Sequence, residues 1–267
     1  MTHARPAPLS ALPDAALASV RGVLTDIDDT LTNAGCLQPD ARAALEALRG
    51  AALPVIAITG RPKGWSEPFA RAWPIEAIVA ENGAVALFRE HGALVVEYAQ
   101  DDATRAVNAT RLRAAAERVL RDVPEARLAA DSAGRVTDIA IDHSEHAHLS
   151  RESVERVVAV MRAQGLHATV SSIHVNGWFG EHDKLSGARW IVQRRLGRDL
   201  DAERERWVYV GDSTNDQRMF GHFPLSVGVA NLLRFADELE VWPSYLAQGE
   251  RGAGFAEVAR RLVGARR

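Results

Sequence analysis

The stretch Thr25-Asp26-Ile27-Asp28-Asp29-Thr30-Leu31-Thr32 comes directly after a short apolar run, Val23-Leu24. An apolar run that stops at carboxylates is typical of a buried parallel strand whose C-terminal end opens into a site. On an ideal strand, Asp26 and Asp28 lie two positions apart and face the same side. Two carboxylates this close repel each other unless a cation or a proton is shared between them. The stretch therefore predicts a cation-binding or proton-binding site, and an acidic turn is the alternative.

Length and composition are those of an ordinary globular protein with room for two unequal domains. The chain has 267 residues, of which 47% are hydrophobic and 25% are charged. Its net charge is −3, with both signs interspersed, so no basic patch for nucleic acid or an anionic membrane is visible. No apolar run approaches the roughly 20 residues that a membrane-spanning helix needs. We therefore expect neither nucleic acid nor a membrane as a partner.

The first residues and the single cysteine bear on the compartment in which the protein works. Residues 1–20 are rich in Ala and Pro and lack a continuous apolar core, so we expect a loose N-terminal arm and no secretory signal. Cys36 is the only cysteine, which excludes a disulfide framework and suits a reducing compartment. These features predict a cytoplasmic protein.

Apolar runs that alternate with helix-like segments predict a parallel sheet. The runs at 54–60 and 77–80 lack polar alternation, as strands buried on both faces do. Repetition of strand and helix is typical of right-handed crossovers. The same rhythm returns with a helix at 184–196 and a strand at 207–211. We therefore predict an α/β fold with a Rossmann-like parallel-sheet core that carries helices on both faces.

Between these two parts the pattern changes to strand pairs and single helices. Strands are expected at 85–88 and 94–98, and again at 127–130 and 136–141, with turn residues inside each pair. Such a pattern predicts an inserted α+β domain, which we call the cap. The predicted division is an N-terminal arm at 1–20, a core made of 21–84 and 181–267, and the cap at 85–180.

Polar side chains stand where the predicted parallel strands end. They are Asp26 and Asp28, Thr59, and Asp212, and Lys184 begins the helix after the insertion. Because parallel strands end at one edge of a sheet, we expect these groups to converge. Three carboxylates and a lysine suggest a hard cation with an anionic ligand, and oxygen ligands suit Mg²⁺. Zinc is disfavoured because no Cys or His ligand spacing lies at these strand ends.

In this order the motifs resemble the haloacid dehalogenase superfamily of phosphotransferases. The matching residues are the D-x-D-x-T of 26–30, Thr59, a lysine, and the G-D-S-x-N-D of 211–216. Asn82-Gly83-Ala84 and an α+β insertion between the second and third motifs resemble the sugar-phosphatase branch. That branch includes sucrose-phosphate and mannosyl-3-phosphoglycerate phosphatases and Cof-like hydrolases. The resemblance spans nearly the whole chain and departs at Asp29, where the family commonly has Gly.

The resemblance implies a catalytic role for four residues. Asp26 is the expected nucleophile, which forms an aspartyl-phosphate. Asp28 is the expected general acid for the leaving oxygen and then the base for the hydrolytic water. Thr59 is expected to hydrogen-bond the transferred phosphoryl group, and Lys184 to neutralise charge on it and on Asp26.

The resemblance also implies how a Mg²⁺ ion is held. The expected metal ligands are the Asp26 carboxylate, the main-chain carbonyl of Asp28 and the Asp212 carboxylate. Asn215 and Asp216 are expected to support the metal-bound waters and Lys184.

Substrate-binding candidates flank these motifs. Arg61 follows Thr59 and is either a phosphate or cap contact or part of a surface turn. Asn82 is either a substrate contact or a turn former. His174 and Asn176, where the last cap strand returns to the core, either bind a sugar or pack at a hinge. Asn231 is predicted to be a helix N-cap.

The function that these expectations favour is Mg²⁺-dependent hydrolysis of a small phosphorylated metabolite, with sugar phosphates as the expected class. A phosphomutase of the same fold is one alternative. The other is a non-catalytic module that binds sugar phosphates. Intact Asp26, Asp28, Lys184 and Asp212 argue against that module, because a binding protein needs no nucleophile paired with an acid.

Overall fold

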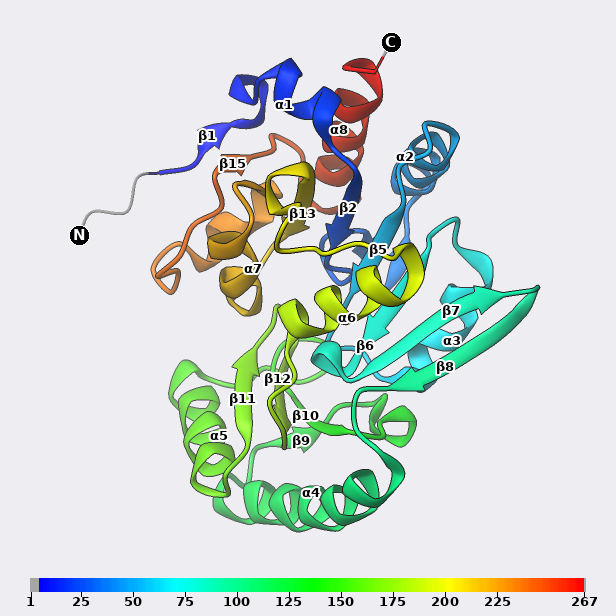
Figure 1. Cartoon of the computed structure of the whole chain (residues 1–267). Coiled ribbons are helices and arrows are strands. Elements are labelled where there is room, and N and C mark those ends of the chain that lie inside the picture. The colour runs from blue at the N-terminus through cyan, green and yellow to red at the C-terminus, as the bar shows by residue number, and fades with distance from the viewer. Residues whose placement is uncertain (1–4, 267) are drawn as a thin grey trace.

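The computed structural model describes residues 5–266 and contains a large sheet, a small sheet and helices packed on both (Figure 1). Its helices are α1 (Asp14–Ser19), α2 (Pro39–Gly50), α3 (Lys63–Ala72), α4 (Asp102–Asp122), α5 (Arg151–Ala163), α6 (Lys184–Leu196), α7 (Gln217–His222) and α8 (Arg251–Gly264). The large sheet contains, in spatial order, β1 (Ala7–Pro8), β15 (Tyr245–Leu246), β14 (Leu225–Gly228), β13 (Trp207–Gly211), β2 (Gly22–Thr25), β5 (Val55–Ile58), β6 (Ala77–Ala80), β7 (Val85–Glu90) and β8 (Ala93–Tyr98). The small sheet contains β11 (His167–Val170), β12 (His174–Trp178), β10 (Asp138–Asp142) and β9 (Arg127–Leu128), and a separate ribbon pairs β3 (Thr32–Asn33) with β4 (Cys36–Leu37).

The order of the large sheet places a topological switch point between β2 and β13. From β1 to β6 every neighbouring pair of strands is parallel. The chain extends from β2 to β5 and β6 on one side, and after the insertion it adds β13, β14 and β15 on the other. Ligands of open α/β sheets bind at such a reversal, at the carboxyl ends of the strands. The predicted α/β class and parallel core are confirmed.

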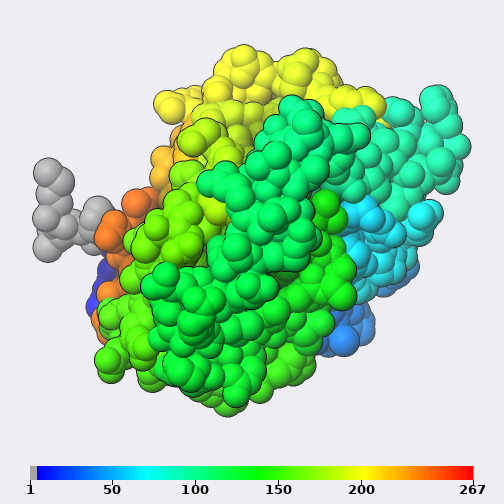
Figure 2. Space-filling view, turned by 90° about the horizontal axis from the view of Figure 1, so that it is seen from below, coloured from blue at the N-terminus to red at the C-terminus, as the bar shows by residue number. Residues whose placement is uncertain are grey.

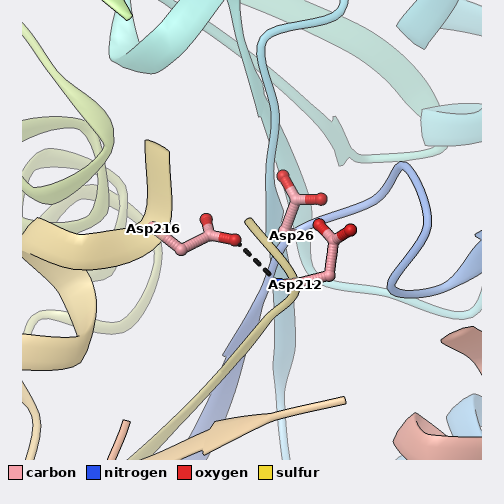
Figure 3. A group of neighbouring side chains, drawn as sticks. All are labelled: Asp26, Asp212 and Asp216. Carbon is pink, nitrogen blue, oxygen red and sulfur yellow. Dashed lines mark hydrogen bonds between the residues drawn. The ribbon is translucent and has the colours of Figure 1, made fainter. Parts of the chain in front are cut away.

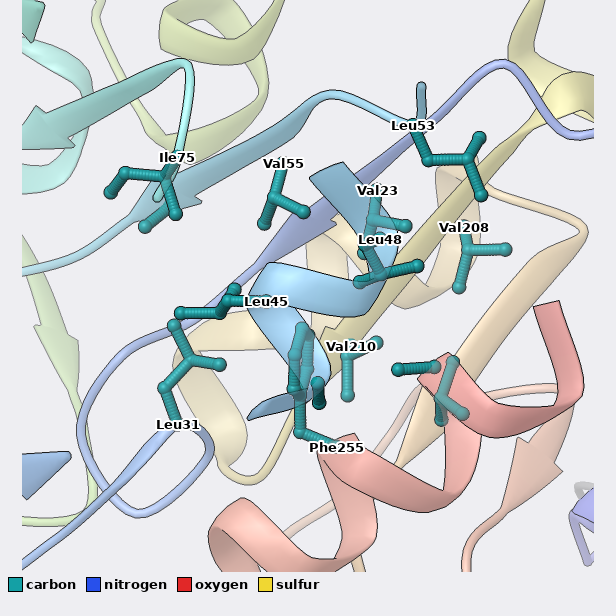
Figure 4. Packing of buried hydrophobic residues seen from close by; sticks show 14 of the residues in the cluster. Val23, Leu31, Leu45, Leu48, Leu53, Val55, Ile75, Val208, Val210 and Phe255 are labelled. Atoms are coloured by element: carbon teal, nitrogen blue, oxygen red, sulfur yellow. The ribbon is translucent and has the colours of Figure 1, made fainter. Parts of the chain in front are cut away.

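Two apolar layers hold the sheet between its helices. Helices α2 and α8 pack on one face, where Leu45, Leu48 and Phe255 contact Val23 and Val210 (Figure 4). Helices α6 and α7 cover the other face through a second buried cluster. Each such buried Leu or Phe contributes roughly 1.5–3 kcal/mol, so the strand ends that carry the predicted site rest on a rigid support.

The hairpin of β7 and β8 lies in the large sheet, which differs from its predicted place in the cap. β7 pairs antiparallel with β6 over four residue pairs, and β8 pairs with β7. The reason is visible in the run Val85–Phe88, which is buried on both faces like a central strand. In the sequence, an antiparallel hairpin that extends the core sheet has the same pattern as one that begins an inserted domain, so the prediction assigned this hairpin to the cap. We therefore propose that the cap begins after Tyr98.

The N-terminal segment is also corrected by the structure. Residues 1–4 of the predicted loose arm lie outside the described residues. From there on the chain is packed: β1 pairs with β15, and α1 contacts α8. Leu9, Leu12 and Leu17 are each at most 1% exposed. Their apolar spacing was the overlooked signal, because side chains of this size stay buried in a folded chain.

The cap is a four-stranded antiparallel sheet with α4 and α5 on one face. Ile139, Ile141 and Val175 face the two helices and form a separate apolar cluster with them. Alternate residues of β10 and β12 point to the opposite face, since successive side chains of a strand alternate. That face is polar and contacts the core: the side chain of Asn176 donates to the carbonyl of Gly60 at 3.2 Å.

Viewed from the cap side, cap residues cover most of the visible face of the molecule (Figure 2). The cap therefore closes over the carboxyl ends of the core strands. Within residues 5–266, none of the helices combines the length and the apolar character needed to span a bilayer.

Candidate active site

Asp26 and Asp212 lie side by side because the two strands that precede them are neighbours at the switch point. Asp26 follows β2 and Asp212 follows β13, and these strands pair in parallel. The backbone N–H of Asp26 donates to the carbonyl of Val210 at 2.9 Å, which fixes the register between the two carboxylates. Figure 3 shows both side chains pointing into the same space. Residues that are 186 positions apart in the sequence thus meet as predicted.

Asp216 approaches from the short 3₁₀ helix Thr214–Asp216 and acts as a hydrogen-bond acceptor for its surroundings. Its Oδ2 accepts from the backbone N–H groups of Asp212, at 2.9 Å, and Ser213, at 3.2 Å (Figure 3). Its Oδ1 accepts from Lys184 at 2.7 Å and from the hydroxyl of Tyr209. These four donors occupy both oxygens. Asp216 therefore shapes the turn and holds Lys184, as predicted, and keeps little capacity for a metal.

Lys184 begins α6 and directs its amino group at Asp26, the predicted nucleophile. Asp183 caps the helix and forms a reciprocal capping box with Ser186. The Nζ atom of Lys184 lies 2.7 Å from Asp26 Oδ1 and 3.2 Å from Asn215 Oδ1. Burial opposes the charge of Lys184, but Asp216 and Asp26 outweigh it and raise the pKa of the ammonium above its ordinary value. Lys184 is therefore a cation held against Asp26.

Gly83 permits the start of α6 to come this close. It has φ +109°, and a Cβ atom at this position would lie 2.0 Å from the carbonyl oxygen of Asp183. Only glycine adopts this conformation and leaves that space free. Gly83 in the Asn82-Gly83-Ala84 motif thus allows the N-terminus of α6, which carries Lys184, to pack against it.

The carboxylate cluster fits a hard cation. Oxygens of Asp26, Asp212 and Asp216 all lie within 4.8 Å of one another and are buried. Burial raises the pKa of Asp26 from 3.8 to about 7, against the lowering effect of Lys184, and burial and Asp26 raise the pKa of Asp212. Three carboxylates with one lysine leave negative charge that a divalent cation would neutralise. Asp26 and Asp212 supply oxygens only, which are the ligands Mg²⁺ prefers.

Thr59 follows β5 and lines the same small cavity as Asp26 and Asp28. Its side chain is 1% exposed, and its hydroxyl oxygen accepts from the backbone N–H of Arg61 at 3.0 Å. The hydroxyl proton stays available to an acceptor in the cavity. The structure therefore brings Thr59 to the predicted place.

Arg61 lies at the contact between core and cap. Its side chain is 4% exposed and binds Asp28 at 2.9 Å, Asp131 at 3.2 Å and Glu145 at 2.7 Å. Burial opposes its charge, but Asp28 and Glu145 raise the pKa of the guanidinium further. One buried cation thus joins the predicted general acid to two carboxylates of the cap.

Glu145 also binds His174, one of the predicted substrate contacts. His174 Nε2 lies 3.0 Å from Glu145 Oε2. This hydrogen bond, together with the contacts from Arg61, lowers the pKa of Glu145 from 4.5 to about 2. Glu145 was not predicted, because it lies in a polar loop after β10 that matches no motif.

Asn176 and Asn82 meet on the polar face of the cap sheet. Their side-chain amides donate to Asp138 Oδ2 at 3.3 and 3.5 Å. Arg135 binds the same carboxylate at 2.9 Å, yet burial raises the pKa of Asp138 from 3.8 to about 7. Asp138 was not predicted as a site residue. The alternation of Asp138 with Ile139 and Ile141 could have indicated that one face of this strand is polar.

Glu81 is a second overlooked residue that joins core and cap. It is fully buried and accepts from the backbone N–H of Lys63 at 3.0 Å and from that of Val136 at 3.1 Å. It also accepts from the N–H and the hydroxyl of Thr137. A buried carboxylate with this many donors is satisfied.

The cavity beside Asp26, the predicted nucleophile, is small. The cavity between Asp26, Asp28, Thr59 and the cap residues around His174 has a volume of about 10 Å³. Such a cavity accommodates about one water molecule. This cavity is too small for a phosphorylated metabolite, whereas a second cavity, of about 410 Å³, is lined by Asn82, Lys184 and Asn215.

Residues 23–113 match the family model of haloacid dehalogenase-like hydrolases. No curated protein sequence matches the chain significantly.

Similar solved structures cover nearly the whole chain at low sequence identity. A Thermoplasma acidophilum protein has 15% identity and a TM-score of 0.69, over 91% of this chain and 98% of that one. A sucrose-phosphatase from Synechocystis, solved with sucrose and phosphate, has 15% identity and a TM-score of 0.64, over 91% and 98%. A superfamily phosphatase from Bacteroides thetaiotaomicron has 14% identity and a TM-score of 0.61, over 96% and 99%. These comparisons confirm the resemblance predicted from the motifs: residues 23–113 match the haloacid dehalogenase-like hydrolases, and the chain shares its fold with a sucrose-phosphatase.

Proposed function

We propose that the protein is a Mg²⁺-dependent phosphatase that hydrolyses small phosphomonoesters through an aspartyl-phosphate on Asp26. The observation that supports this best is the contact of Lys184 Nζ with Asp26 Oδ1 at 2.7 Å, beside the buried carboxylate of Asp212. A carboxylate attacks a phosphate dianion only where countercharge is concentrated. Lys184 supplies part of that countercharge, and a cation held by Asp26 and Asp212 would supply the rest.

In the first step Asp26 attacks phosphorus, and the bond to the leaving oxygen breaks. Asp28 gives its proton to that oxygen, and Lys184 and the Thr59 hydroxyl bind the phosphoryl oxygens. In the second step Asp28 removes a proton from water, which attacks the aspartyl-phosphate and releases phosphate and the free Asp26 carboxylate. Mg²⁺, held by the carboxylates of Asp26 and Asp212 and the Asp28 carbonyl, would neutralise charge on the phosphoryl group.

We propose sugar phosphates as the substrate class. The polar cap face supplies Asn176, His174 and the carboxylates of Asp138 and Glu145, and Asn82 adds an amide from the core. Amides and carboxylates placed this way bind hydroxyl groups, which both donate and accept. The likeness to a sucrose-phosphatase favours the same class.

The test is release of phosphate from a panel of phosphorylated sugars, nucleotides and cofactor phosphates, with and without Mg²⁺. We expect Mg²⁺-dependent release, greatest with a sugar phosphate, and no turnover by Asp26→Asn. The control is Asp102→Asn, the same change on an exposed position of α4. Retained turnover by Asp26→Asn contradicts the covalent mechanism. Interconversion of sugar-phosphate isomers without free phosphate indicates a mutase, and tight binding without any reaction indicates a binding module.

A further inference from the structure

Two residues beside the predicted metal site have left-handed backbone conformations that glycine normally adopts. They are Asp29, with φ +55°, and Arg251, with φ +51°. A side chain with a Cβ atom is strained in this region, so another interaction must hold each residue there. The two residues bind each other: Arg251 Nε lies 2.8 Å from Asp29 Oδ1. This pair joins the loop after β2 to the first residue of α8, which are 222 positions apart.

Asn231 connects this pair to the metal-binding carboxylate. Its side-chain NH₂ donates to Asp212 Oδ2 at 3.0 Å and to the main-chain carbonyl of Asp29 at 3.0 Å. Its Oδ1 accepts from the backbone N–H of Arg251 at 2.8 Å. Because that N–H requires an acceptor, the amide can face in only one direction, with its donors toward Asp212. Asn231 is 2% exposed, so water does not replace these partners.

The same contacts revise the prediction that Asn231 is a helix N-cap. The residue lies inside the 3₁₀ helix Ala230–Phe235, and its side chain binds Asp212, Asp29 and Arg251.

We propose that the Asp29–Arg251 ion pair is a positioning device that fixes Asp212 for Mg²⁺ through the amide of Asn231. The proposal rests on the proposed function, because it requires that Asp212 binds the metal. The left-handed backbone of Arg251 aims its N–H at Asn231, and the ion pair with Asp29 holds that backbone. Asn231 in turn restrains Oδ2 of Asp212, while Oδ1 accepts only a long hydrogen bond, at 3.5 Å, from the Thr30 hydroxyl. Residues that orient metal ligands from behind typically change metal affinity by about 10- to 100-fold.

A purely electrostatic effect of Arg251 would change the Mg²⁺ affinity in the opposite direction, so the direction of the change tests the proposal. The guanidinium of Arg251 is close enough to Asp212 for their charges to interact. Removing a positive charge near a cation site strengthens cation binding if only electrostatics matters. Loss of positioning weakens it. Arg251→Gln therefore distinguishes the two explanations by the direction of the change in Mg²⁺ affinity.

The experiment measures the dissociation constant of Mg²⁺ by calorimetry and the unfolding midpoint without metal, on the full chain. We expect Arg251→Gln and Asn231→Leu to weaken Mg²⁺ binding about tenfold or more. Arg151→Gln, which removes an exposed ion pair on α5, is the control and should bind like the wild type. Unchanged or tighter binding by Arg251→Gln overturns the proposal. If that variant does not fold, Arg251→Lys is used instead: it keeps the charge, so weaker binding supports positioning and unchanged binding overturns it.

A double variant removes the remaining ambiguity. Asp29→Gly with Arg251→Gln leaves the local net charge unchanged and relieves the strain at position 29. We expect metal-free stability at least equal to that of Arg251→Gln alone, with Mg²⁺ affinity still reduced about tenfold. If the pair only stabilised the fold, the Mg²⁺ affinity of the double variant would fall only as far as its metal-free stability falls, and that result overturns the proposal. A Mg²⁺ affinity equal to that of the wild type overturns it as well. Failure of the wild type itself to bind Mg²⁺ is a different result, which overturns the proposed function as well.

Discussion

Replacing Arg61 with methionine should open the cap. The guanidinium of Arg61 binds Asp28 in the core and Asp131 and Glu145 in the cap, all within 3.2 Å. Methionine keeps the apolar stem of the side chain and removes the charge. Asp28 and Glu145 then face each other across the interface without a guanidinium, while Asp131 keeps its ion pair with Arg135 at 3.0 Å. Separation of the cap returns the unpaired carboxylates to water.

The size of the effect follows from the burial of the partners. Removal of one partner from a buried ion pair costs roughly 3–5 kcal/mol. The three carboxylates are between 12% and 22% exposed, so the lower end applies. About 3 kcal/mol corresponds to a change of more than about 100-fold in the ratio of closed to open molecules. Opening of the cap relieves this destabilisation, because it returns the unpaired carboxylates to water, so the core should stay folded.

Hydrogen exchange at two amides reports this opening. The backbone N–H groups of Val136 and Thr137 in the cap donate to Glu81 in the core, so they are protected only while the cap is closed. Arg61→Met should accelerate exchange of the peptide that contains them. Peptides from β10 and β12, whose amides pair inside the cap, should be unchanged. Arg194→Met, which removes exposed ion pairs on the core, is the matched control. Equal exchange rates in the wild type and Arg61→Met at residues 136 and 137 would refute the reasoning.

Three further predictions concern stability. Glu81→Gln should lower the unfolding midpoint by several degrees, because an amide nitrogen then faces buried N–H donors at a cost of roughly 1–3 kcal/mol; an unchanged midpoint in thermal unfolding would contradict this. The pKa of Glu145 is lowered from 4.5 to about 2, so its contribution to stability is complete above pH 4.5 and is lost as the pH falls toward 2. The stability difference between the wild type and Glu145→Gln, measured by denaturant titration, should therefore be constant above pH 4.5 and vanish in stronger acid. Gly22→Ala should destabilise the core by about 1–3 kcal/mol, since a Cβ there would lie 2.4 Å from the Trp207 ring; denaturant titration that shows no loss would contradict this.

The core and the strand-end residues were predictable because local patterns determine them. Apolar runs without polar alternation became β2, β5, β6 and β13, each buried along its whole length. In a parallel sheet, consecutive strand ends meet at one edge whatever the length of the connection. Asp26 and Asp212 therefore meet although the cap separates them in sequence.

The edges of the sheet and the interface with the cap were not predictable in the same way. The β7–β8 hairpin has a local pattern that fits either domain, and only its pairing with β6 decides between them. Contacts such as Arg61 with Glu145 join residues that are 84 positions apart in loops with no period. Positive φ values at Asp29 and Arg251 go with a tertiary contact between residues that are 222 positions apart.

The kind of contact that joins the cap to the core explains how a closed site can still admit a substrate. The apolar cluster of the cap is separate from the two clusters of the core. Between them lie ion pairs of Arg61 and hydrogen bonds to Gly60 and Asp138. Separating an apolar interface forfeits hydrophobic energy in full, whereas separated charges regain hydration that largely offsets the lost attraction. A polar interface therefore opens at lower cost. Arg61, Gly60 and Asn176 of this interface also line the small cavity beside Asp26, so a substrate that replaces their contacts favours closure of the cap around itself.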